Sequence, residues 1–314
     1  MSSLLTNSTA MTALQTLRSV SSQLSTTQNR ISTGQRVSTA SDNAAYWSIA
    51  TSMRSDNAAL AAVSDSLGLS AATVDTEYTA LTSVLGSDGN SGLTKLQALL
   101  VEAKTAGVDR TKIQADITQI QQQLKSTAGA ATFNGINWLS IDTSSSSTAT
   151  PTSFNLVSSY SRVGGTPTIG SITVTTANYA LYTTGGATKT GILDTVTGTG
   201  STAASVDTIA IGALTDSAAD QTTLDGYIKQ VTTAINSVAS AAANLGAVKN
   251  RLSTNTEFVQ SLMDSVDRGI GQLVDADMNK ESTRLAALQV QQQLGVQALS
   301  IANNSSQSIL SLFR

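Results

Sequence analysis

The sequence predicts a mainly α-helical protein in which both termini form a long antiparallel coiled coil or helical bundle, with a β-hairpin and a small inserted β-containing outer domain. Three observations support this prediction: seven-residue apolar repeats in both halves, a middle rich in Thr and Gly, and a scarcity of large side chains. Only 4% of the 314 residues are aromatic, and only two are proline. Long helices with small residues at their contacts fit this composition better than a compact enzyme core does.

The apolar repeats are the strongest signal. A row with a seven-residue period runs through the first half, at Tyr46, Met53, Leu60, Leu67, Val74 and Leu81. A second row runs through Leu224, Val231, Val238, Leu245, Leu252, Val259, Val266 and Leu273, and a shorter run comprises Ile113, Ile117, Ile120 and Leu124. Apolar residues at this spacing lie on one face of a helix. Because each buried side chain contributes roughly 1.5 to 3 kcal/mol, the rows together predict a bundle.

The middle of the chain has a different character. Residues 140–222 hold both prolines and many of the glycines, between short alternations of Thr, Val and Ile. Such alternation with Gly turns indicates short strands. The best strand candidates are "SITVTT" (171–176) and "VDTIAIGAL" (206–214), so we expect a β-containing insertion here.

The two ends keep the helical period with weaker residues. The C-terminal "SIANNSSQSILSLFR" (300–314) carries apolar residues almost to its last position, and residues 285–313 contain no charge. Ordering a chain end costs entropy that must be offset by contacts, so this end is expected to pack against something. Two interpretations remain open for the apolar residues of the ends: a core within one chain, or a contact with another. The residues concerned are Leu14, Leu17, Leu24, Leu294, Ile301 and Leu312.

The composition excludes several functions. The chain has no His and no Cys, which removes the usual general base, the commonest metal ligand and any disulfide. A net charge of −3 offers no basic footprint for nucleic acid. The N-terminus lacks the features of a cleavable signal peptide, and Gln, Asn and Ser interrupt every apolar run of the tail, so no membrane span is expected.

Signatures of catalysis or metal binding are weak. The "GGATKTG" stretch (185–191) lacks the Gly-Lys-Ser/Thr ending of a phosphate loop. Four acids, Asp264, Asp267, Asp275 and Asp277, can be read as a cation site or as a solvated helix face, and the second interpretation is favoured. We therefore expect no catalytic residue, no cofactor and no metal.

Three segments carry a resemblance to a known family. The first is "NRISTGQRVSTASDNAAYWSIA" (29–50), the second is "DADMNKESTRLAALQVQQQLGVQALSIANNSSQSILSLFR" (275–314), and the third is "TFNGINWL" (132–139), which is similar to the turn that opens a β-hairpin in that family. In order and spacing they resemble the signatures of bacterial flagellins, particularly those of rhizobia and their relatives. The resemblance implies a structural subunit that polymerises into the flagellar filament.

The family architecture implies a division of the chain. Residues 1–41 with 275–314 would form an inner terminal coiled coil, residues 42–140 with 223–274 a helical bundle with the β-hairpin, and residues 141–222 a variable outer surface domain. The inner seam through which subunits polymerise would comprise Leu4, Leu5, Leu14, Leu17, Leu24, Ile31, Leu294, Ala298, Ile301, Ile309, Leu312 and Phe313.

The implied partners follow from the same resemblance. They are further copies of the chain, alone or mixed with similar flagellins, the hook-associated junction and cap proteins, an export chaperone and the flagellar type III export apparatus. Neither nucleic acid nor a membrane span is implied, and the protein would be secreted into the extracellular filament.

Departures from the family pattern fall in segments that innate receptors bind. Asp42 and Asn43 stand where the usual form has Asp-Asp, and Tyr46 stands where it has Gly. In residues 92–106 the motif L-Q-R-x-R-E-L-x-x-Q is altered, with Lys95, Ala98 and Glu102 in place of Arg, Glu and Gln and only Leu99 kept. We expect weak activation of the vertebrate toll-like receptor and weak recognition by the plant flagellin receptor.

Two other functions remain as alternatives. A hook–filament junction protein shares the terminal helices but usually lacks so complete a signature at residues 30–50. A secreted coiled-coil adhesin or pore-forming effector would not need the paired terminal signatures.

Overall fold

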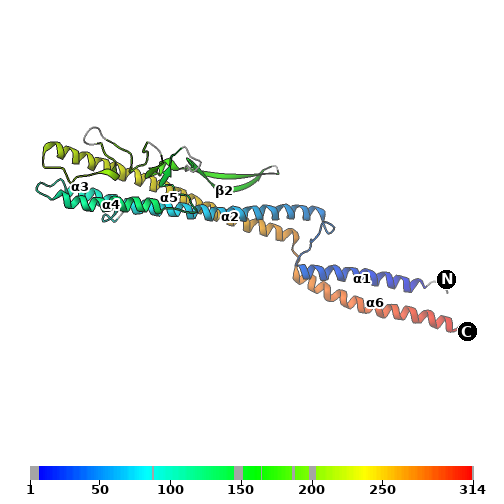
Figure 1. The fold of residues 1–314 in the computed structure, drawn as a ribbon. Helices are drawn as coiled ribbons and strands as arrows, with labels where there is room; N and C mark the ends of the chain where they lie inside the picture. The colour runs from blue at the N-terminus through cyan, green and yellow to red at the C-terminus, as the bar shows by residue number, and fades with distance from the viewer. Residues whose placement is uncertain are drawn as a thin grey trace. The chain divides into compact units, whose positions relative to one another are not determined.

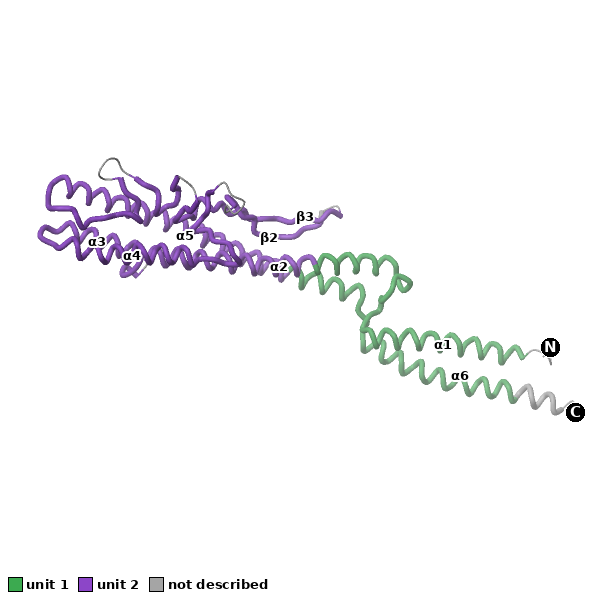
Figure 2. The backbone as a smooth tube through the Cα atoms, in the orientation of Figure 1, with its two compact units in different colours: residues 1–58, 262–314 green, residues 59–261 purple. Residues whose placement is uncertain are grey.

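The computed structural model describes residues 7–86, 88–144, 151–163, 165–185, 188–197 and 203–312. The chain forms two compact units, residues 1–58 with 262–314 and residues 59–261 (Figure 2). Its helices and strands follow in the order α1 (Ser8–Thr33), α2 (Ala44–Leu85), α3 (Gly92–Glu102), α4 (Arg110–Ala130), β1 (Ser140–Asp142), β2 (Ser153–Val163), β3 (Thr166–Thr175), η1 (Thr176–Asn178), β4 (Tyr182–Thr184), η3 (Val206–Thr208), α5 (Ala218–Val274) and α6 (Met278–Leu312) (Figure 1). The mainly α-helical fold with a small β-containing middle is thus confirmed.

The larger unit, residues 59–261, is built on the predicted apolar rows. The residues of the first row that belong to this unit are buried in α2, and those of the second row are buried in α5. Three of the four residues of the short run are buried in α4. The buried row residues are Leu60, Leu67, Val74, Leu81, Ile113, Ile117, Leu124, Leu224, Val231, Val238, Leu245, Leu252 and Val259. Because these positions recur at the helical period, each helix buries one continuous stripe against its neighbours.

A glycine-rich turn separates α2 from α3. Gly86, Gly89 and Gly92 have φ angles of 70°, 70° and 60°, in the left-handed region that side chains disfavour. Gly86 and Gly92 are also crowded, since a Cβ on Gly92 would lie 2.3 Å from the Val84 carbonyl oxygen. The chain reverses here because these glycines permit both the conformation and the close approach.

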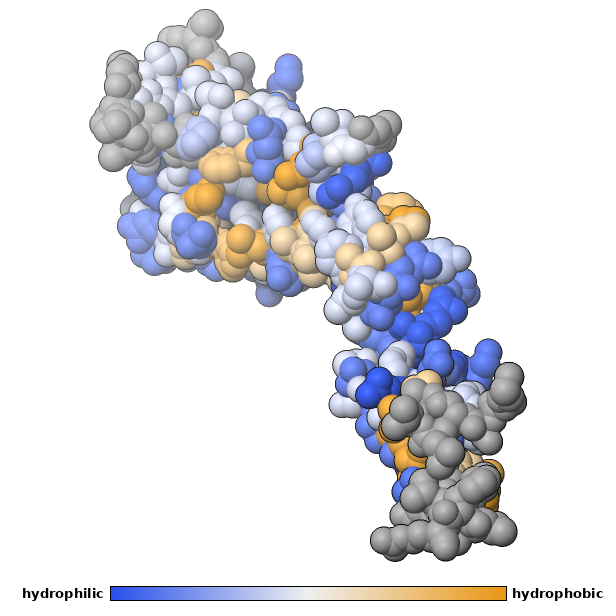
Figure 3. Space-filling model, turned by 90° about the vertical axis from the view of Figure 1, so that its right-hand side faces the viewer, coloured by the Kyte–Doolittle hydropathy of each residue, from blue (hydrophilic) through white to orange (hydrophobic). Residues whose placement is uncertain are grey.

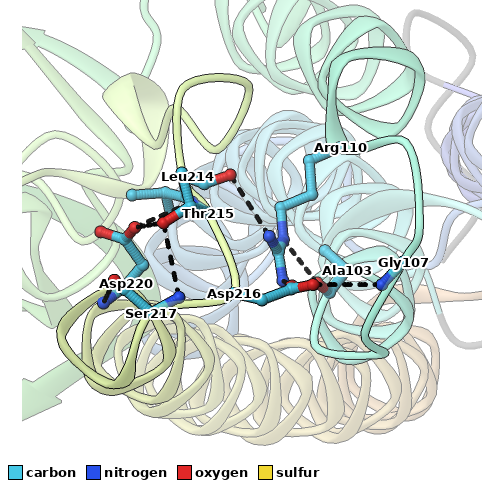
Figure 4. A network of polar contacts seen from close by, with 8 residues as sticks. All are labelled: Ala103, Gly107, Arg110, Leu214, Thr215, Asp216, Ser217 and Asp220. Carbon is cyan, nitrogen blue, oxygen red and sulfur yellow. Dashed lines mark hydrogen bonds and ion pairs between the residues drawn. The ribbon is translucent and has the colours of Figure 1, made fainter.

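A buried arginine ties the start of α4 to the segment before α5. The Arg110 guanidinium donates to the carbonyl oxygens of Ala103 (2.9 Å) and Leu214 (3.2 Å) and to Asp216 Oδ1 (2.6 Å) (Figure 4). The hydrogen bond from Arg110, aided by the amide of Gly107, holds the pKa of Asp216 below its usual value. A buried cation with three partners fixes the α3–α4 connection against the segment that enters α5.

The β-structure consists of two small sheets. β1 pairs in parallel with β4, while β2 and β3 form an antiparallel hairpin from Ser153↔Thr175 to Val163↔Thr166, with an irregularity between Val157 and Ser159. The strand predicted at 171–176 is confirmed for residues 171–175, which end β3.

The strand predicted at 206–214 is wrong. Residues Val206–Thr208 form η3, and residues 209–214 belong to no strand in the part of the chain that the structure describes. Glutamine side chains of α4 satisfy the backbone instead. Gln121 Nε2 donates to the carbonyls of Val206 and Ile209, and Gln114 Oε1 accepts from the Ile211 amide. An apolar alternation needs a strand partner to become a strand, and here helix side chains occupy that place.

The "FNG" turn is present but short. Phe133 and Ile136 exchange two backbone hydrogen bonds around Asn134 and Gly135, whose φ angles are 51° and 78°. Asn-Gly is the dipeptide preferred by such a two-residue turn. The pairing stops after this single bridge, so the extended hairpin of the protein is β2–β3 and not this turn.

One acidic side chain of the larger unit is fully buried. Glu77 of α2 is 0% exposed, and its Oε1 accepts a hydrogen bond from the Trp138 amide (2.9 Å). Its Oε2 is buried without a hydrogen-bond partner in the described structure. Burial raises the pKa of Glu77 to about 7, against the smaller opposing effect of the Trp138 amide.

The smaller unit contains α1, α6, the start of α2 and the end of α5. Ala50 of α2 packs with Ile270 and Val274 of α5 in a small apolar core. The chain enters and leaves the terminal helices at one place, because the Arg36 and Val37 amides donate to the Val274 carbonyl and the Ala276 amide donates to the Gly34 carbonyl.

Candidate functional site

The two terminal helices pack against each other along a row that the sequence does not display as apolar. α1 and α6 run antiparallel, with their outer ends side by side (Figure 1). On α6, one row consists of four residues spaced seven apart. Three of them, Glu281, Leu288 and Ala302, are buried, and the remaining one, Gly295, contacts Leu17. On α1, the buried residues are Val20 and Thr27, which are also seven apart. Small side chains therefore allow a close approach of the two helices.

Polar contacts hold this helix pair at both ends. Arg30 Nη1 lies 3.2 Å from Glu281 Oε1 at the inner end, with both side chains largely shielded from solvent. At the outer end, Asn7 Nδ2 donates to the Ala302 carbonyl (3.0 Å), while Asn7 Oδ1 caps α1 by accepting from the Ala10 amide. The partly buried ion pair fixes the register of the helices more than it adds stability.

The predicted seam residues fall into two groups. Leu14, Leu294 and Ile301 are 38%, 57% and 69% exposed, and Ala298 is exposed too. Leu17, Leu24 and Ile31 are half-buried, and Leu17 lies next to Gly295 of α6. Leu4, Leu5 and Phe313 lie outside the described residues, as do the side chains of Ile309 and Leu312.

Further exposed apolar residues extend this surface. Met11 precedes Leu14 by one turn of α1, and Val290 precedes Leu294 by one turn of α6, so Val290, Leu294 and Ile301 follow one stripe. Figure 3 shows apolar side chains on the surface of the terminal helices between hydrophilic ones. The spacing of Val290 from Leu294 in the sequence was the signal that could have added it to the seam.

The residues of the altered receptor segments lie in two places. Asp42 accepts hydrogen bonds from the Thr39 and Ser38 amides, which lower its pKa, and Asn43 caps α2 by accepting from the Tyr46 amide. The other four lie on α3, where Leu99 is buried, Lys95 half-buried, and Ala98 and Glu102 exposed.

Two chemical features are absent from the described part of the chain. No described helix is long and apolar enough to cross a membrane. The aspartates from Asp264 to Asp277 form no group that could hold a metal ion, nor do other described His, Cys, Asp or Glu residues.

Comparisons with known proteins match the chain at both ends. The family model of the bacterial flagellin N-terminal helical region matches residues 4–143, and that of the C-terminal helical region matches residues 228–313. Flagellin C of Rhizobium meliloti is 45% identical over 333 residues, the flagellin of Brucella melitensis 46% over 315, and Flagellin A of Rhizobium meliloti 39% over 410. Each alignment covers 100% of both chains.

The paired terminal helices expose an apolar stripe, which is typical of a protein that assembles with others. With both terminal regions matched and relatives similar over their full length, the chain belongs to the bacterial flagellin family. It is a structural subunit of the flagellar filament, which drives motility, and not an enzyme.

Proposed function

We propose that subunits polymerise through the exposed side of the α1–α6 pair, which carries Leu14, Leu294, Ala298 and Ile301 of the predicted inner seam. The observation that carries this proposal is the exposure of Leu14, Leu294 and Ile301 on a helix pair whose internal contact uses a different row. Large apolar side chains that the chain itself leaves uncovered favour contact with another copy. The absence of charge from residues 285–313 supports the proposal, since a contact covered on all sides disfavours unpaired charge.

The geometry required of this contact is head-to-tail. A filament grows when one surface of a subunit binds a different surface of the next and the rotation does not close into a ring. In this proposal residues 1–41 with 275–314 form the inner coiled coil, residues 42–140 with 223–274 the surrounding bundle, and residues 141–222 the outer surface. Isolated helices with so few large residues are marginal, so assembly would supply much of their stability.

The finer partners and route are proposed on the family resemblance. Copies of this chain, alone or with similar flagellins, would assemble between hook-associated junction proteins and a cap. An export chaperone and the flagellar type III apparatus would deliver the secreted chain. Pull-down of the chaperone by wild-type protein and its loss with a truncated C-terminus would test this part.

The test of the seam uses matched substitutions. Leu294→Gln and Ile301→Gln should raise the critical concentration for sedimentable polymer, while Ile169→Gln on β3, at a position 66% exposed, should leave it unchanged. Deletion of residues 300–314 should abolish sedimentation. Polymerisation of the deletion protein at wild-type concentrations would refute the terminal seam. A collapse of helicity in the depolymerised Gln variants would show instead that these residues are ordinary core.

A further inference from the structure

The turn at residues 133–136 contains the only Asn-Gly pair of the chain, Asn134 and Gly135. In the part of the chain that the structure describes, Asn134 is also the only non-glycine residue with a positive φ angle, 51°. Both residues are exposed, and apart from the chain neighbours no atom lies within 4 Å of the position that a Cβ on Gly135 would occupy. The space around the peptide unit that joins them is therefore open.

The side chain of Asn134 and the backbone nitrogen that follows it are both free. Among the described residues, neither the Asn134 carboxamide nor the Gly135 amide has a hydrogen-bond partner. The bonds that close the turn belong to its flanks, where the Phe133 amide donates to the Ile136 carbonyl and the Ile136 amide to the Phe133 carbonyl, both at 2.9 Å. This bridge is isolated and belongs to neither small sheet. Because so few contacts hold the turn, its local opening costs little free energy.

Asn137, three residues further along, is the opposite case. Its Nδ2 donates to the Ala128 carbonyl (2.8 Å), and its Oδ1 accepts from the amides of Leu139 (2.8 Å) and Ser140 (2.7 Å). The backbone nitrogen that follows it, that of Trp138, itself donates a hydrogen bond to a buried carboxylate. A carboxamide held at both of its polar atoms is not free to turn toward that nitrogen. The same loop therefore contains one free and one held asparagine.

We infer that Asn134 is a site of spontaneous deamidation in the folded protein. The Gly135 nitrogen loses its proton to solvent base and attacks Asn134 Cγ, so that a new C–N bond closes a succinimide ring. The bond from Cγ to the side-chain nitrogen breaks, and that nitrogen takes up a proton and leaves as ammonia. Water then opens the ring to aspartate or isoaspartate, so the reaction consumes one water and releases one ammonia. Glycine favours the attack because it has no Cβ to hinder the approach.

The two products affect the turn differently. Aspartate adds one negative charge and tolerates the left-handed conformation much as asparagine does. Isoaspartate places the side-chain methylene in the backbone, so the hydrogen bonds between Phe133 and Ile136 lose their register. Aged subunits would therefore acquire charge at residue 134, and those with isoaspartate would lose the bridge that closes the turn.

Mass spectrometry of aged protein tests this site. Full-length depolymerised protein is kept at mildly alkaline pH, with and without urea, and the tryptic peptide of residues 126–162 is followed over days. In folded protein, Asn134 should be converted at a rate within about tenfold of its rate in urea, because the turn opens at low cost. Asn137 in the same peptide should stay unmodified. A folded rate below about one-hundredth of the urea rate would show that the turn protects Asn134, and the inference would be wrong.

The identity of the product and one variant test the route. Direct hydrolysis of the side chain gives aspartate alone, whereas ring opening also gives isoaspartate, which isoaspartate methyltransferase detects. Aspartate without isoaspartate at residue 134 would therefore exclude attack by the Gly135 nitrogen. Gly135→Ala should slow the conversion about tenfold or more, since its Cβ hinders that attack. The comparison is repeated in urea, where strain at a positive φ angle plays no part, and an unchanged rate there would also contradict the route.

Discussion

Leu17 of α1 lies so close to Gly295 of α6 that a Cβ on residue 295 would come within 2.9 Å of Leu17 Cδ1. Gly295 is the one residue without a side chain in a row whose other members, Glu281, Leu288 and Ala302, are buried against α1. A glycine inside a helix costs about 1 kcal/mol relative to alanine, so the close approach is the physical reason for it here.

Substitutions at Gly295 should separate two opposing effects. In Gly295→Ala, a gain of about 1 kcal/mol in helix propensity offsets a small rotation of the flexible Leu17 side chain, so filament stability should hardly change. In Gly295→Leu a rotation of Leu17 cannot make room for the larger side chain. This variant should therefore lower the temperature of thermal depolymerisation, measured by light scattering. Gly68→Leu is the control, because the space around Gly68 is open. An unchanged depolymerisation temperature in Gly295→Leu would contradict the packing described above.

The buried Glu77 predicts a pH dependence of the larger unit. Its pKa of about 7 lies above the ordinary value of 4.5, so the folded state binds the proton more tightly than the unfolded state does. Stability should therefore be fully present below about pH 4.5 and fall as the pH rises toward 7 and above. A shift of this size corresponds to about 3 kcal/mol.

Glu77→Gln keeps an Oε1 acceptor for the Trp138 amide but has no charge to bury. In urea unfolding of depolymerised protein, this variant should gain stability over wild type at pH 8 and gain little at pH 4.5. Glu257→Gln, at an exposed glutamate of α5, is the matched control. If stability changed with pH in parallel for wild type and Glu77→Gln, Glu77 would be excluded as the source of the pH dependence.

The turn between α2 and α3 offers two glycines with similar backbones and different surroundings. Both Gly89 and Gly92 have positive φ angles, but only Gly92 is crowded, by the Val84 carbonyl at 2.3 Å from an added Cβ. Gly89→Ala should cost about 1 to 2 kcal/mol for the left-handed conformation alone. Gly92→Ala adds a backbone clash and should lower the urea midpoint further. Equal urea midpoints for the two variants would mean that the backbone of the turn shifts to accommodate the added Cβ of residue 92, and would contradict the prediction.

Receptor recognition is predicted to be weak and partly restorable. On α3 three motif positions are altered, and Leu99, which is kept from the family motif, is buried and so offers no accessible side chain. Depolymerised protein should activate toll-like-receptor reporter cells less than a flagellin with the usual motif. Lys95→Arg, Ala98→Glu and Glu102→Gln together should raise the response. A full response from the unchanged chain would disprove the prediction.

Much of the helical architecture could be predicted because its rows are apolar. Leu60 to Leu81 and Leu224 to Val259 show their burial through spacing alone, and the structure buries them as expected. The contact of α1 with α6 could not be predicted in the same way. Its row contains a glutamate and a glycine, and it is recognisable only when the opposite helix and Arg30 are known.

Other features depend on partners distant in the sequence. The segment at 206–214 alternates like a strand, but Gln114 and Gln121 of α4 satisfy its backbone. Burial of Glu77 depends on the position of Trp138, and nothing near either residue in the sequence indicates it. Tyr46 and Trp47 are exposed at the start of α2, although Tyr46 belongs to an apolar row that suggests a buried helix start.

The parallel pairing of β1 with β4 brings together the two ends of the segment that contains β2 and β3. Ser140 pairs with Tyr182 and Asp142 with Thr184, so the excursion through β2 and β3 leaves and returns at adjacent points. A loop closed at neighbouring points can be lengthened at little entropic cost, about 0.6 kcal/mol for each doubling. Peptides inserted at the exposed end of the β2–β3 hairpin would therefore be displayed at little cost, provided that the buried residues Leu156, Ile172 and Val174 are kept.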